Sequence, residues 1–210
     1  MQLIINNKVY TDNSKEADEN SVFVVSKQNE KFKQNAIDNG CKNIIDSSEL
    51  KNHIDLSSIK IIGITGTNGK TTTTYLLEQL LGEEKVARVG TVEYKIGDEI
   101  IEAPNTTPES LDIVKMCKKI VQKKIPYLVM EVSSHALMLG RVDMLEFDVA
   151  IFSNLTPKHL DFHKNMNDYY LAKRNIFTKL KKVDNKVIGK PIINIDDEYG
   201  KRLFKSNSNM

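Results

Sequence analysis

Apolar and polar stretches alternate along the chain with the spacing of strands and helices. From residue 60 onward, short runs rich in β-branched residues predict strands over 60–65, 86–94, 127–132, 148–153 and 191–195. Longer segments with apolar residues at helical spacing predict helices over 70–81, 108–124 and 166–180. Strands that alternate with helices of this length predict a mostly parallel sheet covered by helices on both faces.

The start of the chain has a different pattern. Short apolar runs alternate with polar turns, and residues 36–40 end like a helix with a glycine cap. We therefore predict a small domain over 1–58, in which the polar segment 51–58 is a linker, and a second domain over 59–210. The predicted fold class is α/β, a small N-terminal α/β domain followed by a mostly parallel sheet domain.

A loop punctuated by glycines follows the first strand of the second domain and ends in Gly-Lys-Thr-Thr. Gly66 and Gly69 allow the backbone N–H groups of this loop to converge on a phosphate. Lys70 can then reach the β- and γ-phosphates, and the Thr71 hydroxyl can bind Mg²⁺. A helix that begins near Lys70 also favours an anion at its N-terminus. The loop therefore predicts a P-loop-type nucleotide site.

The composition indicates a globular protein without a nucleic-acid or membrane partner. The chain has 30 basic and 28 acidic residues and a net charge of +2. The lysine-rich segment 118–124 has apolar residues at helical spacing, which favours a solvated helix face. Cys41 and Cys117 are the two cysteines, and we see no signal peptide or transmembrane segment. We expect a monomer in the reducing cytoplasm with both thiols buried.

Glu131 lies at the end of a predicted strand, where a carboxylate can bind Mg²⁺ beside a phosphate loop. The segment VSSHALMLGR follows it, and we interpret its first residues, Ser133, Ser134 and His135, as a polar loop. In this segment Ser133 offers a hydroxyl, and Arg141 carries a forked donor suited to phosphate. A pair of helix-capping serines with a surface arginine explains the same segment as well.

Two histidines and a lysine near the C-terminal end have competing interpretations. His159 and His163 are four residues apart, but Leu160 stands where a zinc-protease helix has glutamate, so we expect no zinc site. His159 as a single ligand to Mg²⁺ stays open. Lys173 lies among apolar residues, and lysines so placed usually extend to solvent.

The turn PNTTPE at 104–109 precedes a predicted helix. Asn105, Thr106 and Thr107 offer an amide and two hydroxyls there. Thr107 is well placed to cap the helix. Capping and ligand binding are compatible, because a helix N-terminus prefers anions.

Six motifs in this order and spacing make the chain resemble the Mur ligase family: GTNGKTT, NTTP, EVSSHAL with a following GR, NLT with HLDFH, LAK and NIDDE. The resemblance runs from about Asp12 to the C-terminus. EVSSHAL with Gly140 and Arg141 is most similar to the branch that adds the third residue of the peptidoglycan stem peptide.

The resemblance implies roles by position. ATP would be bound by Gly66, Thr67, Asn68, Gly69, Lys70, Thr71 and Thr72. Mg²⁺ would be held by Thr71, Glu131, His159 and Lys173, the last as a carbamate, and the catalytic residues would be Lys70, Glu131, His159 and Lys173. UDP-muramoyl dipeptide would contact Asn105, Thr106, Thr107, Ser133 and Arg141, and its uridine part Thr11 and Asn13. Asn194 and Asp197 would lie near the nucleotide.

The implied reaction is ATP-dependent amide bond formation in cytoplasmic peptidoglycan precursor synthesis. The D-Glu carboxylate of UDP-MurNAc-L-Ala-D-Glu would attack the γ-phosphate, and the amine of a diamino acid would displace phosphate from the acyl phosphate. Meso-diaminopimelate is the expected amino acid, with L-lysine second. A folylpolyglutamate synthetase-like ligase and a non-catalytic nucleotide-sugar-binding module are the alternatives.

Three departures from the family pattern bear on this expectation. Leu139 stands where members often have an amide side chain, and Lys158 stands where an acidic residue commonly precedes the histidine. The family also has a C-terminal domain that binds the incoming amino acid, and we expect the chain to end before it. We therefore expect ligand binding but little or no ligation from these 210 residues.

Overall fold

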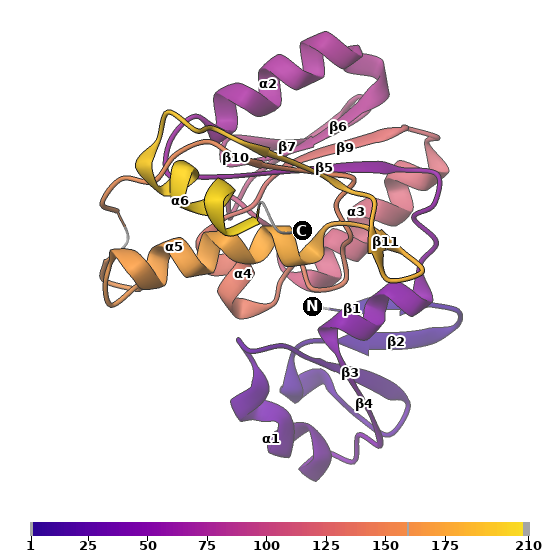
Figure 1. Ribbon diagram of the computed structural model, residues 1–210. Coiled ribbons are helices and arrows are strands. Elements are labelled where there is room, and N and C mark those ends of the chain that lie inside the picture. Colours follow the sequence, from indigo (N-terminus) through magenta and orange to yellow (C-terminus); the bar gives the residue numbers. More distant parts are fainter. Residues whose placement is uncertain (1, 159, 208–210) are drawn as a thin grey trace.

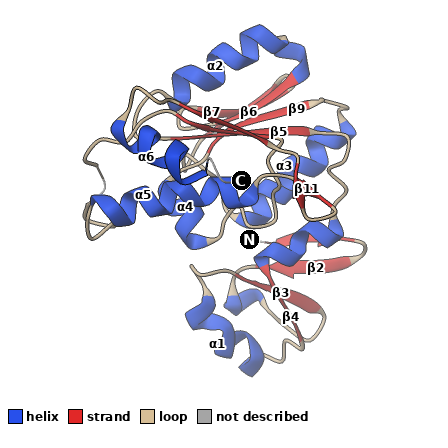
Figure 2. Cartoon of the chain, in the orientation of Figure 1, coloured by secondary structure: helices blue, strands red, loops and turns tan. Residues whose placement is uncertain are grey.

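A computed structural model describes residues 2–158 and 160–207 and contains two main sheets (Figure 1). The smaller sheet has the order β1-β2-β3-β4, and the larger one has the order β13-β10-β5-β9-β6-β7-β8. Helices cover the larger sheet on both faces, as Figure 2 also shows. The predicted α/β fold class is confirmed.

The smaller sheet is formed by the first part of the chain. Its strands are β1 (Gln2–Ile5), β2 (Lys8–Thr11), β3 (Ser21–Val25) and β4 (Asn43–Asp46), and its helix is α1 (Lys33–Asp38). β1 and β2 are antiparallel, and the other pairs are parallel. The hairpin between β1 and β2 turns at Asn6 and Asn7, which both have positive φ, as a type I′ hairpin turn requires.

The larger sheet is parallel over five strands and antiparallel at one edge. Its strands are β5 (Lys60–Thr65), β6 (Val86–Val89), β7 (Glu93–Ile96), β8 (Glu99–Glu102), β9 (Tyr127–Glu131), β10 (Val149–Phe152) and β13 (Lys190–Ile193). A separate hairpin is formed by β11 (Lys182–Val183) and β12 (Lys186–Val187). β5 lies between β10 and β9, so the loop after it emerges near the middle of the sheet.

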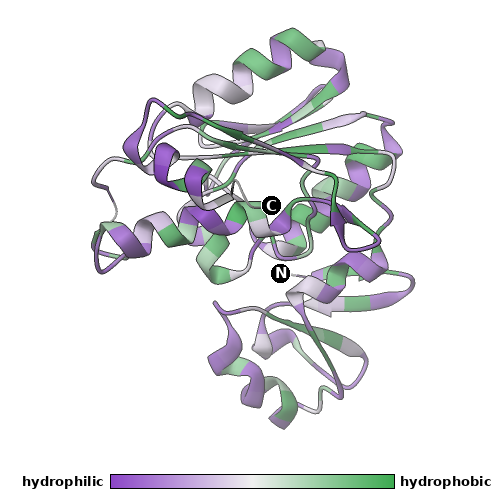
Figure 3. Ribbon diagram, viewed as in Figure 1, coloured by the Kyte–Doolittle hydropathy of each residue, from purple (hydrophilic) through white to green (hydrophobic). Residues whose placement is uncertain are grey.

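The two faces of the larger sheet have separate apolar cores. The helices are α2 (Lys70–Leu81), α3 (Ser110–Gln122), α4 (Ser134–Leu139), α5 (Met166–Arg174) and α6 (Glu198–Asn207). Ile62 and Ile64 pack with the α2 residues Leu77 and Leu81, whereas Ile61 belongs to the core on the α3 side. Figure 3 shows hydrophobic residues concentrated in the central strands. Because neighbouring residues of β5 face opposite cores, the apolar run at its centre is explained by burial on both faces.

A buried ion pair joins α2 to the sheet. Arg88 of β6 is only 2% exposed, and its Nε lies 2.6 Å from Glu78 Oε2 of α2. Its Nη2 lies 2.7 Å from Glu93 Oε1, and its guanidinium stacks 3.6 Å from the ring centre of Tyr75. These contacts fix α2 against the sheet, and the phosphate loop leads directly into that helix.

Most strands and helices begin within two residues of the predicted positions, and three predictions are wrong. The segment 86–94 is not one strand, because the chain turns after Val89 and returns as the antiparallel β7. The segment after Glu131 is not a polar loop, because Ser134–Leu139 forms α4. The helix expected over 166–180 ends at Arg174 and continues as a 3₁₀ turn. β8 and α6 were not predicted.

The smaller sheet packs against the larger unit through apolar residues. Ile5 and Tyr10 belong to the same buried cluster as the α3 residues Leu111 and Val114. Both cysteines are buried, as predicted, and burial raises the pKa of the Cys117 thiol to about 12. In the part of the chain that the structure describes, no helix has the length and apolar character that crossing a bilayer requires.

Candidate functional site

The phosphate loop lies between β5 and α2, as predicted. Gly66 has a φ of 146° and Gly69 a φ of 82°, so both adopt backbone conformations that suit glycine. Helix α2 begins at Lys70, and the N–H groups of its first turn have no partners within the helix. These groups point their partial positive charge toward the loop, which favours a bound phosphate.

The segment after β10 clamps this loop. The Thr67 N–H donates to Asn154 O at 2.9 Å, and the Asn68 N–H donates to Asn154 Oδ1 at 2.9 Å. The Ser153 hydroxyl donates to Asn68 O at 2.7 Å. Asn194, which the resemblance placed near the nucleotide, donates from Nδ2 to Ser153 O at 2.8 Å. Hydrogen bonds from the segment after β10 therefore fix the conformation of the phosphate loop without a bound ligand.

Two lysines converge on the same carbonyl of the loop. Lys70 Nζ donates to Gly66 O and Thr67 O, both at 3.0 Å. Lys173 Nζ of α5 donates to Gly66 O at 2.8 Å and is 2% exposed, so it does not extend to solvent. Burial lowers the pKa of Lys70. Burial and the charges of Lys70 and Lys158 lower the pKa of Lys173 well below its usual value.

Glu131 is the last residue of β9, bonds to Thr71 at the start of α2 and is 1% exposed. Its Oε1 accepts from the Thr71 hydroxyl at 2.8 Å and from the Thr91 N–H at 2.9 Å. Its Oε2 accepts from the Thr91 hydroxyl at 3.0 Å. The structure thus brings together Thr71 and Glu131, two of the residues predicted to bind a metal.

This donor set fits Mg²⁺ when phosphate oxygens complete the coordination. Among residues 2–158 and 160–207, no group of three or more His, Cys, Asp and Glu side chains is placed to hold a metal ion. Mg²⁺ does not require such a group, because it is usually coordinated by one or two carboxylates together with phosphate oxygens and water. Glu131 and Thr71 supply an oxygen each, and Lys173 lies against the same loop. His159, also predicted as a ligand, lies outside the described residues.

Replacing Lys173 with methionine should stabilise the fold near neutral pH. The unfolded lysine keeps its usual pKa of 10.5, whereas the folded pKa is lower, so folding costs free energy wherever the unfolded side chain is protonated. Methionine removes this cost and loses one hydrogen bond, so we expect a net gain on the order of 1 kcal/mol, as when other buried ionic groups are replaced by apolar ones. The cost falls as the pH rises from the folded pKa toward 10.5, so the gain should shrink in alkali.

Denaturant unfolding at about pH 7 and about pH 9.5 measures this gain. Lys201→Met is the matched control, because Lys201 is an exposed residue of α6. A Lys173→Met variant less stable than the unaltered protein at neutral pH would contradict the prediction. So would a gain that grows with pH.

The predicted substrate-contact residues line the loop before α3 and the start of α4. The Thr107 hydroxyl donates to Glu131 O at 2.9 Å and accepts from the Ser133 N–H at 3.0 Å. Thr107 does not cap α3, because Glu109 occupies that position. Ser133 is the N-cap of α4, so the capping interpretation of this residue is confirmed. Asn105 O accepts from the Tyr94 hydroxyl, which fixes the start of the loop.

Arg141 joins this region to the smaller sheet. Its Nε and Nη2 donate to Gln28 Oε1 at 3.2 and 3.1 Å. Its Nη1 donates to Thr107 O at 3.1 Å, and its Nη2 lies 2.8 Å from Glu109 Oε1. The guanidinium is therefore not a free surface group, and it lies where the two parts of the molecule meet.

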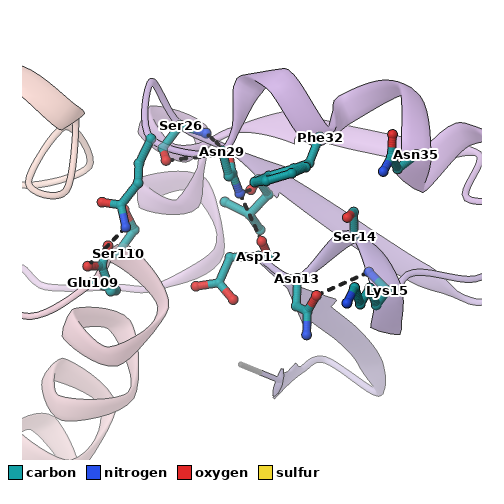
Figure 4. Close-up of a pocket in the computed structure, with 12 residues that line it drawn as sticks. Asp12, Asn13, Ser14, Lys15, Ser26, Asn29, Phe32, Asn35, Glu109 and Ser110 are labelled. Carbon is teal, nitrogen blue, oxygen red and sulfur yellow. Dashed lines mark hydrogen bonds between the residues drawn. The ribbon is translucent and has the colours of Figure 1, made fainter.

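A cavity of about 380 Å³ lies at this junction (Figure 4). Its wall includes Asn13, Asn29 and Phe32 from the smaller unit and Glu109 and Ser110 from the start of α3. Asn13 was predicted as a uridine contact and lines the cavity. Thr11, its predicted companion, is fully buried, and its hydroxyl accepts from the Asn13 N–H at 3.1 Å, which holds the turn.

Several residues of this region were not found from the sequence. Thr91, Gln28, Asn29 and Phe32 carry no motif by themselves, and Asn154 belongs to the NLT motif but had no predicted contact. A partial signal existed for Asn154, because it lies just after a predicted strand of the sheet, where ligands gather. Gln28 and Asn29 lie after β3, but nothing in the sequence shows that α3 closes the cavity beside them.

Comparisons with known proteins agree on one family. Residues 64–210 match the model of the Mur ligase middle domain. The UDP-N-acetylmuramoyl-L-alanyl-D-glutamate–2,6-diaminopimelate ligase of Fusobacterium nucleatum is 58% identical over 146 residues, which are 70% of this chain and 29% of the relative. The corresponding ligase 1 of Clostridium acetobutylicum is 50% identical over 153 residues, 72% of this chain and 30% of the relative.

Solved structures show the same fold. A UDP-N-acetylmuramoyl-L-alanyl-D-glutamate–2,6-diaminopimelate ligase superposes with a TM-score of 0.73 and 24% identity, covering 95% of this chain and 45% of that one. MurF from Acinetobacter baumannii superposes with a TM-score of 0.54 and 16% identity, covering 95% of this chain and 46% of that one. The chain spans about three tenths of the length of the curated relatives it matches. With its phosphate loop, its buried strand-end glutamate and a middle-domain match over 64–210, the chain belongs to the Mur ligase family.

Proposed function

We propose that this chain is the nucleotide- and UDP-sugar-binding part of an ATP-dependent ligase that adds 2,6-diaminopimelate to UDP-N-acetylmuramoyl-L-alanyl-D-glutamate. The observation that carries this is the clamped phosphate loop, in which Lys70 bonds two loop carbonyls and the next residue, Thr71, bonds the buried Glu131. The curated relatives named above carry out this ligation, which supports the choice of amino acid over L-lysine. It would be a cytoplasmic step of peptidoglycan precursor synthesis, and we propose that the chain acts as a monomer.

The loop would hold the triphosphate of ATP through the N–H groups at the start of α2. Lys70 would stabilise the charge that develops on the γ-phosphoryl oxygens while the D-Glu carboxylate attacks and ADP leaves. Bound Mg²⁺, held through Thr71, Glu131, His159 and the carbamate of Lys173, would neutralise further charge on the phosphates. The incoming amine then displaces phosphate from the acyl phosphate. The protein's main contribution is to position the carboxylate in line with the phosphorus.

We propose that residues 1–58 bind the UDP-muramoyl dipeptide together with the middle domain over 59–210. The cavity at the junction is large enough for a nucleoside, and its wall has the mixture of ring and amide groups that a base needs. Phe32 is 43% exposed and offers a ring face for stacking, and Asn13 offers hydrogen bonds. Arg141, Asn105, Thr106, Thr107 and Ser133 would then contact the sugar and dipeptide, with Thr11 supporting the turn.

Calorimetric titration tests both sites on this chain. Magnesium with the non-hydrolysable ATP analogue AMP-PNP and, separately, UDP-MurNAc-L-Ala-D-Glu should each bind with a stoichiometry of one. Arg141→Ala should weaken the binding of UDP-MurNAc-L-Ala-D-Glu about tenfold or more, because a charge-assisted bond to an anionic ligand is lost. The same variant should leave AMP-PNP binding unchanged.

Arg202→Ala is the matched control, because Arg202 is an exposed arginine of α6 that packs on Tyr170. Failure of either ligand to bind the unaltered chain would refute the assignment of that site.

A further inference from the structure

Thr91 lies in the turn between β6 and β7, outside every motif that supports the proposed function. Its N–H and hydroxyl reach different oxygens of one carboxylate, at 2.9 Å from Glu131 Oε1 and 3.0 Å from Oε2. The preceding Gly90 lies so close that an added Cβ would be 2.5 Å from Glu131 Oε1. The turn therefore packs closely against the Glu131 carboxylate and hydrogen-bonds both of its oxygens.

The bonds of Glu131 fix the direction in which it can accept a cation. A carboxylate offers about four lone-pair positions, and among the described groups Thr71 and Thr91 occupy three of them. Two of these bonds are on Oε1, so the remaining position is on Oε2. The Thr91 hydroxyl supplies the bond to Oε2, and together with the two bonds to Oε1 it restrains the carboxylate against rotation about its last torsion.

The Thr91 hydroxyl also touches the substrate-contact loop, because its Oγ1 lies 3.1 Å from Thr106 Oγ1. A hydroxyl has one proton, and a carboxylate only accepts. The Thr91 proton therefore goes to Glu131, and the Thr106 proton goes to Thr91. A chain of donors runs from the substrate-contact loop to the carboxylate.

We propose that Thr91 is a positioning residue that holds the Glu131 carboxylate in the orientation that accepts Mg²⁺ and connects it to Thr106. This rests on the proposed function, because it takes Glu131 as the metal-binding carboxylate beside bound nucleotide. Thr91 itself is an exposed residue, so its hydroxyl can be removed without opening the core.

The test compares AMP-PNP affinity with Mg²⁺ and with EDTA, by calorimetry, for the unaltered chain, Thr91→Val and Thr91→Ser. The ratio of the two affinities measures the contribution of the metal. Thr91→Val should lower this ratio about tenfold, as loss of a partner behind a metal ligand typically does. Thr91→Ser keeps the hydroxyl and should stay within about threefold of the unaltered chain. The EDTA affinity and the thermal midpoint should change little in either variant.

Each other outcome is informative. A Thr91→Val ratio equal to that of the unaltered chain overturns the positioning role while the proposed function stands. Equal losses in the valine and serine variants also overturn it, because shape and not the hydroxyl would then be responsible. An unaltered chain that binds AMP-PNP no better with Mg²⁺ than with EDTA contradicts the proposed metal site and this role together.

Discussion

Lys70→Met should weaken the binding of magnesium and AMP-PNP about 10- to 100-fold while leaving the fold intact. Charge-assisted hydrogen bonds of buried groups contribute roughly 1.5–3 kcal/mol, and each 1.4 kcal/mol is a factor of ten in affinity. Lys70 Nζ already lies within the loop, 3.0 Å from two of its carbonyls, so little rearrangement is needed to reach a phosphate. Methionine keeps most of the apolar part of the side chain and removes the ammonium group, with its charge and its hydrogen bonds to Gly66 O and Thr67 O.

Lys60→Met is the control. Lys60 begins β5, at the end of that strand opposite the phosphate loop, and its side chain is 59% exposed in its pair with Asp148. An exposed pair of this kind contributes less than about 1 kcal/mol to stability, and it is remote from the loop. Calorimetry should show unchanged nucleotide affinity in this control. Nucleotide affinity in Lys70→Met within about threefold of the unaltered chain would remove Lys70 from the phosphate site.

The phosphate loop and its flanking elements were predictable because their signals are local. β5 and α2 have the predicted bounds, since a β-branched run, a glycine loop and a closing glycine are adjacent in sequence. The same holds for Glu131 at the end of β9. In contrast, the strand expected over 86–94 was wrong because its apolar pattern continues through the turn. In the structure the chain turns after Val89, where Thr91 contacts Glu131 from 40 residues away.

The features of the site that could not be predicted from the sequence are contacts between segments far apart in the chain. Asn154 clamps Asn68 across 86 residues, and Gln28 meets Arg141 across 113. Single polar residues carry no periodicity that would reveal such pairing. The residues alone left the burial of Lys173 undecided, because an apolar helix face fits a lysine that extends to solvent as well as one held inside. Only the position of Gly66 O opposite this helix decides between them.

Gly66→Ala should abolish detectable AMP-PNP binding and lower the free energy of unfolding by about 2–4 kcal/mol. Glycine adopts the φ of 146° at this position, and other residues do so only with strain of order 1–3 kcal/mol. An added Cβ would also collide with Ser153 Oγ and lie 3.1 Å from Asn154 N, so the clamp itself would be displaced. Both effects act on the backbone that shapes the phosphate site, which is why binding and stability should fall together.

Two further variants separate the collision from the backbone strain. Gly69→Ala has a positive φ of 82° but nothing within 4 Å of the added Cβ, so it should cost only about 1–2 kcal/mol. Ser153→Gly combined with Gly66→Ala should recover about 1 kcal/mol or more relative to the sum of the single changes, because the colliding oxygen is gone. Denaturant unfolding of the unaltered chain, the two single glycine variants, Ser153→Gly and the double variant measures these losses. Strictly additive losses in the double variant would mean that strain alone, and not contact with the clamp, requires glycine at position 66.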